Sequence, residues 1–193
     1  MLKIDKDSIW VMWPDFLVDN FIDYPSNKIF GHDGNFNFTI EFEILKEVVE
    51  KMTLFAKLPS YFGIDIEENG LLLILNEDST ETKYLNKDYD WGVGKRYKLI
   101  VGKFENTIKI ILNDELILTH ILNRNLVLDV SPHIIFGSGN FPKNGFNLNY
   151  FYGNIHYLSI EKDGEILSEH TFDKFIHNKS YDLTGNCNFI HKI

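Results

Sequence analysis

The stretch "FNFTIEFEI", residues 36–44, is the clearest indicator of fold in this chain. Its apolar and polar residues alternate strictly. On a β-strand, five apolar side chains would share one face: Phe36, Phe38, Ile40, Phe42 and Ile44. The polar side chains would share the other: Asn37, Thr39, Glu41 and Glu43. This pattern predicts a half-buried antiparallel strand.

Comparable segments recur along most of the chain. Further strands are expected at 52–56, 62–67, 71–75, 96–104, 106–113, 115–120, 133–136, 153–162 and 166–172. Tight turns are expected at Glu105-Asn106, Asn113-Asp114 and Asp163-Gly164, whose residue types suit reversals of direction. Helical periodicity is nearly absent. The segment "LKEVVEKM" (45–52) fits either a short helix or an extension of the preceding strand.

Turn signals about every eight to twelve residues are typical of an all-β sandwich or barrel. No linker, repeat or low-complexity tract divides the 193 residues. We therefore expect residues 1–193 to form a single all-β domain.

Composition narrows the classes of partner. Hydrophobic residues make up 44% of the chain, enough for a substantial core, and the formal net charge is -9. Nucleic-acid binding is not expected, because phosphates require a basic surface. No apolar run is long enough for membrane insertion. The N-terminus lacks the apolar core of a signal peptide, so we expect a soluble chain that is not secreted by its own signal. The single cysteine, Cys187, excludes an internal disulfide.

The order of several segments resembles the concanavalin A-like lectin/glucanase superfamily, in its laminin-G-like branch. The segments are "FNFTIEFEI", "YFGIDIEENGLLLIL", "GKRYKLIVGKFENTIKIILNDELIL", "IIFGSGN" and "FYGNIHYLSIEKDGEIL", within about residues 30–172. Gly94-Lys95-Arg96-Tyr97 stands where the family has Gly-x-Trp-Tyr, and Asp114 replaces the hairpin glycine. The resemblance implies a two-sheet antiparallel jelly-roll sandwich whose concave face often binds glycans.

Glucanases of this superfamily carry a strand with a Glu-x-Asp-x-Glu or Glu-x-Asp-x-x-Glu motif. By this resemblance Asp65 would take the middle position and Glu67 or Glu68 the general-acid position. The nucleophile position falls on Gly63, which has no side chain. Retaining hydrolysis needs two carboxyl groups about 5–5.5 Å apart. We therefore interpret these acidic residues as the solvated face of a strand that ends in a turn at Asn69-Gly70, and no catalytic residue is expected.

Two expected loops combine aromatic and polar residues suited to sugars, whose apolar ring faces stack on aromatic side chains. The first, residues 86–97, supplies the candidate ligand contacts Tyr89, Asp90, Trp91 and Arg96. The second, residues 137–153, supplies Asn140, Phe141, Asn147 and Tyr150. For both loops the alternative is structural: packing for Trp91, and a plain connection for the second loop.

Metal sites are weakly indicated. Laminin-G-like domains often hold calcium near the rim, so the resemblance leaves calcium open, with Asp15, Asp88 and Asp90 as candidate donors. The seven histidines and the cysteine show no zinc-ligand spacing.

The leading hypothesis is a non-catalytic carbohydrate-recognition domain with a shallow aromatic-lined surface. The first alternative is a structural or assembly module of a phage or bacterial surface, making protein–protein contacts that include a homo-oligomer. A glycoside hydrolase ranks third, because the nucleophile is absent.

Overall fold

The structure is a computed structural model. It describes the backbone of residues 2–4, 9–13, 34–57, 62–76, 82–123, 134–136, 151–172, 175–176, 179–180 and 188–192. Side chains are described for residues 34–55, 62–75, 83–123 and 151–172. Within these residues all regular structure is β, and every strand pairing is antiparallel. No described residue belongs to a helix that could cross a membrane.

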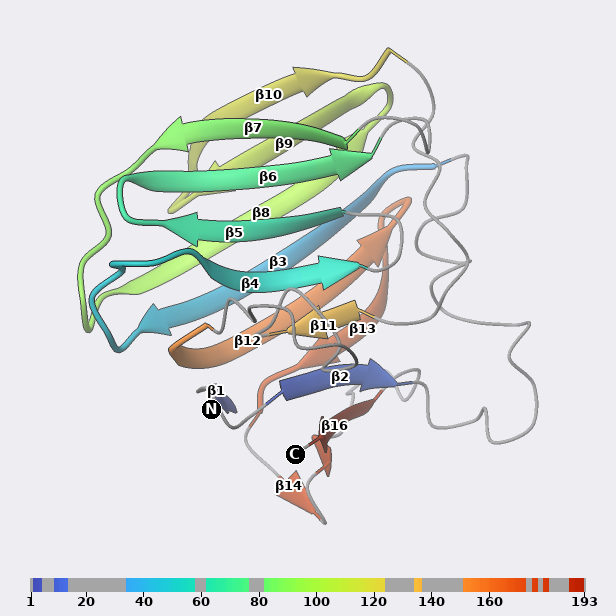
Figure 1. Ribbon diagram of the computed structural model, residues 1–193. Coiled ribbons are helices and arrows are strands. Elements are labelled where there is room, and N and C mark those ends of the chain that lie inside the picture. The colour runs from blue at the N-terminus through green and yellow to red at the C-terminus, as the bar shows by residue number, and fades with distance from the viewer. Residues whose placement is uncertain are drawn as a thin grey trace.

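The strands form two sheets (Figure 1). Sheet A runs in the order β1 (Leu2–Ile4), β12 (Gly153–Lys162), β3 (Phe36–Ile44), β8 (Arg96–Phe104), β9 (Thr107–Leu112) and β10 (Glu115–Ile121), and β13 (Glu165–His170) also pairs with β12. Sheet B runs in the order β14 (Phe175–Ile176), β15 (Lys179–Ser180), β16 (Asn188–Lys192), β2 (Ile9–Trp13), β11 (Ile134–Phe136), β4 (Met52–Lys57), β5 (Phe62–Glu67), β6 (Gly70–Asn76) and β7 (Thr82–Asp88). The prediction of an all-β, two-sheet antiparallel sandwich is confirmed.

The core lies between the sheets and consists mainly of side chains from alternate strand positions. On β3 the apolar residues are fully buried and the polar ones partly exposed, as the alternation predicts. Aromatic rings of the two sheets pack against each other. Phe38 of sheet A stacks on Phe55 of sheet B, with 5.4 Å between the ring centroids. Phe36 packs edge to face against Phe62, with 5.6 Å between the ring centroids. Each fully buried phenylalanine contributes about 1.5–3 kcal/mol through burial, so these contacts hold the sheets together.

Two of the predicted turns have the backbone that suits a two-residue hairpin. Asn113 and Asp114 have φ of 51° and 66°, and Asp163 and Gly164 have φ of 50° and 86°. Positive φ at both central residues marks a type I′ turn, whose twist matches that of the flanking strands.

Three details differ from the sequence-based expectations. Residues 45–51 form neither a helix nor an extension of β3, and β4 begins at Met52. The turn after β5 is formed by Glu68 and Asn69, while Gly70 already belongs to β6. The expected loop 86–97 begins inside β7, which extends to Asp88.

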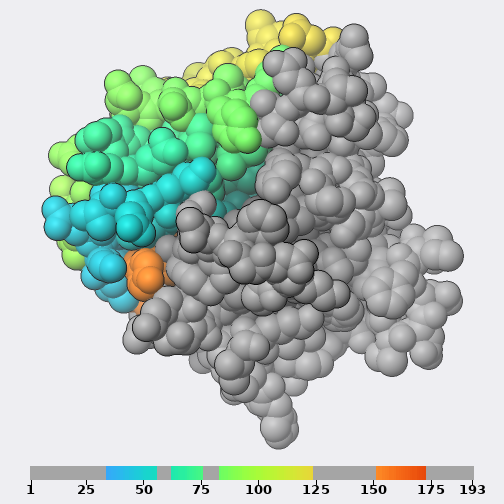
Figure 2. All heavy atoms as spheres, in the orientation of Figure 1, coloured from blue at the N-terminus to red at the C-terminus, as the bar shows by residue number. Residues whose placement is uncertain are grey.

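Figure 2 shows the face of the molecule on which β4 to β7 form a continuous surface. In the same orientation β3, β8 and β9 lie behind these strands (Figure 1). Each sheet therefore has a face directed away from the core, which we call its outer face. Candidate sites on the two outer faces can be considered separately.

Candidate functional site

Three segments distant in sequence meet at one end of sheet A: the start of β3, the β8–β9 turn and the β12–β13 turn. The backbone N–H of Asn35 donates to Asp163 Oδ1 (2.7 Å), and the N–H of Asp163 donates to the carbonyl of Asn35 (3.0 Å). The side chain of Asn35 accepts the N–H of Glu105 in the β8–β9 turn. These bonds fix the three segments relative to one another, as a binding site on loops requires.

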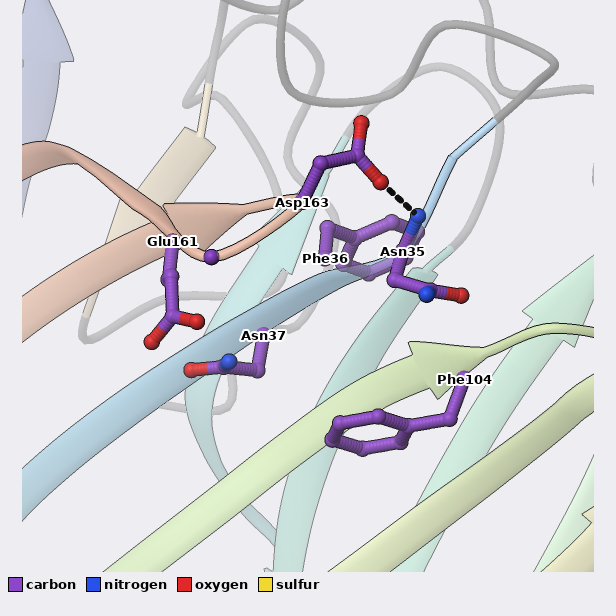
Figure 3. A pocket seen from close by; sticks show the side chains of 7 residues that line it. Asn35, Phe36, Asn37, Phe104, Glu161 and Asp163 are labelled. Carbon is purple, nitrogen blue, oxygen red and sulfur yellow. Dashed lines mark hydrogen bonds between the residues drawn. The ribbon is translucent and has the colours of Figure 1, made fainter.

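A pocket of about 280 Å³ opens at this junction (Figure 3). Seven described residues line it: Asn35, Phe36, Asn37, Phe104, Glu161, Asp163 and Gly164. Its volume lies near the lower limit of about 300 Å³ for small-molecule sites, so we expect it to hold one ring of a larger ligand. We call it the Phe104 pocket.

The base of the pocket follows from strand register. Asn37 of β3 lies between Glu161 of β12 and Gly102 of β8, so these three residues form one row across neighbouring strands. Figure 3 shows the side chains of Glu161, Asn37 and Phe104 standing on three neighbouring strands, with Asn35 and Asp163 at the rim. The row belongs to the outer face of sheet A, because β3 directs its apolar residues into the core.

Gly102 leaves room for the edge of the Phe104 ring. A Cβ at residue 102 would lie 2.9 Å from Cε2 of Phe104 and 2.6 Å from the carbonyl oxygen of Phe36. The space beside the Gly102 backbone is therefore occupied by its neighbours, among them the edge of the ring. A strand-interior glycine that admits such a close approach is a common device in sheets. Lys109 lies on one side of the ring, with Nζ 5.5 Å from the ring centroid.

Two polar groups of the pocket are not engaged elsewhere. Among the described residues, no hydrogen bond or ion pair occupies the amide of Asn37 or the carboxylate of Glu161, and both side chains are partly exposed. An amide both donates and accepts, and a carboxylate accepts at two oxygens. A ring with several hydroxyl groups could therefore satisfy both groups while its apolar face contacts Phe104.

The predicted contacts Tyr89 and Trp91 lie together at the other end of the sandwich. Their ring centroids are 4.6 Å apart, and Trp91 also contacts Tyr97 at 5.0 Å and Phe42 at 6.1 Å. The indole N–H of Trp91 donates to the carbonyl of Gly70 (2.8 Å). Trp91 is half-buried and its only polar group is engaged, so these contacts describe a packing residue with part of its ring exposed.

The other two candidates of this loop lie differently. Asp90 is exposed between Tyr89 and Trp91. Arg96 is exposed at the start of β8 and lies opposite Glu43 of β3. Because successive strand residues point to opposite faces, Arg96 points away from the cluster that its neighbour Tyr97 joins.

The second predicted loop lies outside the described residues, and so do all four of its candidates: Asn140, Phe141, Asn147 and Tyr150. Asp15, a candidate calcium donor, also lies outside them. Among the described residues no group of three or more Asp, Glu, His or Cys side chains could hold a metal ion. The candidates Asp88 and Asp90 are exposed and take part in no such group.

The expectation that Asp65 lies on a solvated strand face is wrong. Its side chain is buried, accepts a hydrogen bond from Thr53 Oγ1 (2.7 Å) and lies 3.4 Å from Lys51 Nζ. Its register neighbours on that face, Thr53 and Leu72, are buried as well, so this part of the outer face of sheet B is covered. Burial raises the pKa of the Asp65 carboxyl above its ordinary value, and the contacts with Thr53 and Lys51 oppose this effect only in part.

A second, acidic pocket of about 220 Å³ lies beside the β5–β6 turn. Eight described residues line it: Glu67, Glu68, Asn69, Gly70, Leu71, Asn86, Lys87 and Asp88. It contains both residues considered for the general-acid position, but none of its described lining residues is aromatic. Of the two pockets, the Phe104 pocket is the one with a described aromatic ring in its lining.

Sequence comparison identifies no relatives: no family model matches the chain, and neither does any curated protein. Several solved structures share its fold. A candidate carbohydrate-binding protein from Bacteroides ovatus ATCC 8483 superposes with a TM-score of 0.70 at 10% identity, over 99% of this chain and 57% of that one. The Ruminococcus gnavus IT-sialidase CBM40, bound to α2,3 sialyllactose, has a TM-score of 0.54 at 15% identity, over 70% of this chain and 78% of that one.

The binding domain of botulinum neurotoxin DC, in complex with rat synaptotagmin II, has a TM-score of 0.52 at 18% identity. That match covers 66% of this chain and 32% of the neurotoxin domain. This chain thus spans little more than half of the Bacteroides protein and about a third of the neurotoxin domain. At such identities the likeness establishes a β-sandwich fold, and a ligand has to be argued from the residues of this chain.

Proposed function

We propose that this chain is a non-catalytic, lectin-like domain of the concanavalin A-like type that binds a glycan in the Phe104 pocket. One observation carries the proposal: a partly exposed aromatic ring beside an amide and a carboxylate that no described residue engages, in a pocket of about 280 Å³. The fold supports it, since two of the structures that share the fold are described as carbohydrate-binding.

The residues of β5 favour glycan binding over glycan hydrolysis. Gly63 supplies no nucleophile, and the Asp65 carboxylate is buried and bonded to Thr53. A carboxylate enclosed in this way cannot approach an anomeric carbon without breaking its own contacts. Asp65 is therefore proposed to be structural in this chain.

The residues predicted from the two loops are kept as secondary ligand contacts in the proposal. Tyr89, Asp90, Trp91 and Arg96, together with Asn140, Phe141, Asn147 and Tyr150, remain predicted ligand contacts. Trp91 would contribute only the exposed part of its ring, because its N–H is bonded to Gly70. The described contacts favour the Phe104 pocket as the principal site.

A glycan array probed with the labelled protein, followed by titration calorimetry of each hit, tests the proposal. We expect binding to at least one glycan and at least a tenfold weaker affinity in Asn37→Ala, because about 1.4 kcal/mol of hydrogen bonding is lost. Asn86→Ala, at an exposed asparagine of β7 in sheet B, is the matched control and should bind normally. No binding by the wild-type protein, or equal effects of the two variants, would overturn the proposal.

A second candidate function, an assembly module, is favoured by the edge of sheet A. Among the described residues β10 pairs only with β9, and it exposes Leu116 and Ile121 at 54% and 65%. An exposed edge with apolar side chains can pair with another chain, although the irregular register at Leu116/Leu118 would hinder it. Light scattering after size exclusion tests this alternative: an oligomer that Ile121→Lys dissociates would support it, and a monomer at all concentrations would exclude self-assembly.

A further inference from the structure

The charged side chains that line the Phe104 pocket, among the described residues, are both acidic. Glu161 and Asp163 line it, and no described lysine, arginine or histidine does. Asp163 Oδ1 is bonded to the backbone N–H of Asn35, whereas no described residue neutralises Glu161. The protein as a whole carries a formal net charge of -9, so no long-range positive field offsets these carboxylates.

Three described lysines lie near this pocket. The side chain of Lys162 runs beside Gly34. Lys103 is buried, and its Nζ donates to the carbonyl of Gly34 (2.9 Å). Lys109 lies over Phe104, with Nζ 5.5 Å from the ring centroid. An acidic sugar that stacked on this ring would therefore meet Glu161 and Asp163, and the described residues of the pocket supply no arginine clamp of the kind that binds carboxylates in two places.

We propose that the Phe104 pocket selects uncharged sugar rings and rejects sugars that carry a carboxylate or sulfate. The inference rests on the proposed function and adds the charge class of the ligand. Hydroxyl groups can donate to Glu161 and either donate to or accept from Asn37, so an uncharged ring satisfies both side chains. A carboxylate cannot donate, and it repels Glu161 at short range.

The test is an array on which neutral oligosaccharides stand beside their sialylated or sulfated counterparts. We expect the wild-type protein to bind neutral members and to bind their acidic counterparts at least fivefold more weakly. The repulsion between two unit charges about 4 Å apart in a water-like medium weakens the affinity about fivefold, and partial burial of the charges increases this factor. Equal or preferential binding of the acidic members would overturn the inference while the proposed function stands, and no binding to any member would overturn the proposed function itself.

Two further measurements identify the cause of the discrimination. Glu161→Gln should improve binding of the acidic counterparts about fivefold relative to the neutral members. The matched control is Glu47→Gln, which removes the same charge from an exposed residue that does not line the pocket. This control should leave the ratio of neutral-sugar affinity to acidic-sugar affinity unchanged. Raising the salt to about 1 M, where the Debye length is about 3 Å, should also narrow the ratio. If neither Glu161→Gln nor high salt changes the ratio of neutral-sugar affinity to acidic-sugar affinity, the acidic sugars are excluded sterically, and the electrostatic inference is overturned.

Discussion

Replacing Trp91 with alanine removes an aromatic side chain that joins the β7–β8 connection to the rest of the sandwich. The ring lies 4.6 Å from Tyr89 and 5.0 Å from Tyr97, and its N–H donates to Gly70 at the start of β6. Each of these contacts links residues 89–97 to neighbouring strands or orders that segment itself. The variant therefore tests whether Trp91 is a packing residue, as its contacts indicate.

The size of the effect can be derived from these contacts. The indole hydrogen bond contributes about 0.5–1.5 kcal/mol, and each close aromatic pair adds about 0.5–1.5 kcal/mol beyond burial. Truncation of a fully buried tryptophan costs about 3–5 kcal/mol, and Trp91 is only half-buried. We expect Trp91→Ala to lower the free energy of unfolding by about 3 kcal/mol. Trp91→Phe, which loses chiefly the hydrogen bond, should lower it by about 1 kcal/mol.

Urea unfolding followed by circular dichroism measures both values, because the strands report the global transition. Tyr84→Ala is the control, an exposed aromatic residue on β7 whose loss should cost less than about 0.5 kcal/mol. A loss below about 1 kcal/mol in Trp91→Ala would refute the packing assignment. Near-normal stability of Trp91→Phe combined with lost glycan binding would instead assign Trp91 to ligand contact.

Three further predictions concern stability and the pocket. Burial raises the pKa of the Asp65 carboxyl in the folded protein above its value in the unfolded chain. The carboxyl's contribution to the free energy of unfolding therefore falls as the pH rises from the unfolded pKa to the folded pKa. The free energy of unfolding of Asp65→Asn minus that of the wild type should therefore increase as the pH rises from about 4. If urea unfolding gave the same difference between variant and wild type at every pH, this prediction would be contradicted. Gly102→Ala should crowd the Phe36 carbonyl, Asn37 and the Phe104 ring and weaken glycan binding at least tenfold, and unchanged affinity in a folded variant would show that the pocket does not depend on this glycine. Asn113→Ala should cost about 1–2 kcal/mol in urea unfolding, because alanine tolerates the positive φ poorly and the Lys98 N–H loses its acceptor; a neutral effect would argue against the turn geometry.

Several strands were predictable from the sequence. The segments 36–44, 62–67 and 153–162 match β3, β5 and β12 in their bounds. In β3 alternate apolar residues fit one buried face, and in β5 and β12 a high density of branched and aromatic residues favoured a strand. β7 was not predicted, because its sequence TKYLNKD is polar and lies at the edge of sheet B among the described residues, where little apolar surface is buried.

Burial of Asp65 could not be predicted from alternation. The period of two assigns Asp65 and Ile64 to opposite faces, and it says nothing about whether the second face is covered. The structure shows that it is covered at Asp65, where Thr53 and Leu72 are buried beside it. The same pattern therefore describes a solvated face on β3 and an enclosed one on part of β5.

The Phe104 pocket has no local sequence signature. It combines Asn37, Phe104 and Glu161 from three strands, and the bond that fixes its rim joins Asn35 to Asp163, 128 residues apart. Only the register of β12, β3 and β8 places Glu161, Asn37 and Gly102 in one row, with Phe104 two residues further along β8. The Asp163-Gly164 turn was predicted from its residue types, but its role at the rim depends on tertiary contacts.

Titration of the Phe104→Ala variant with the best glycan found on the array tests the central claim most directly. The account predicts that this variant keeps its strand circular dichroism and unfolds cooperatively, yet binds at least tenfold more weakly, since stacking on an aromatic side chain contributes about 1–3 kcal/mol. Tyr84→Ala should bind as wild type does. A folded Phe104→Ala variant with wild-type affinity would contradict the account and move the site away from this pocket.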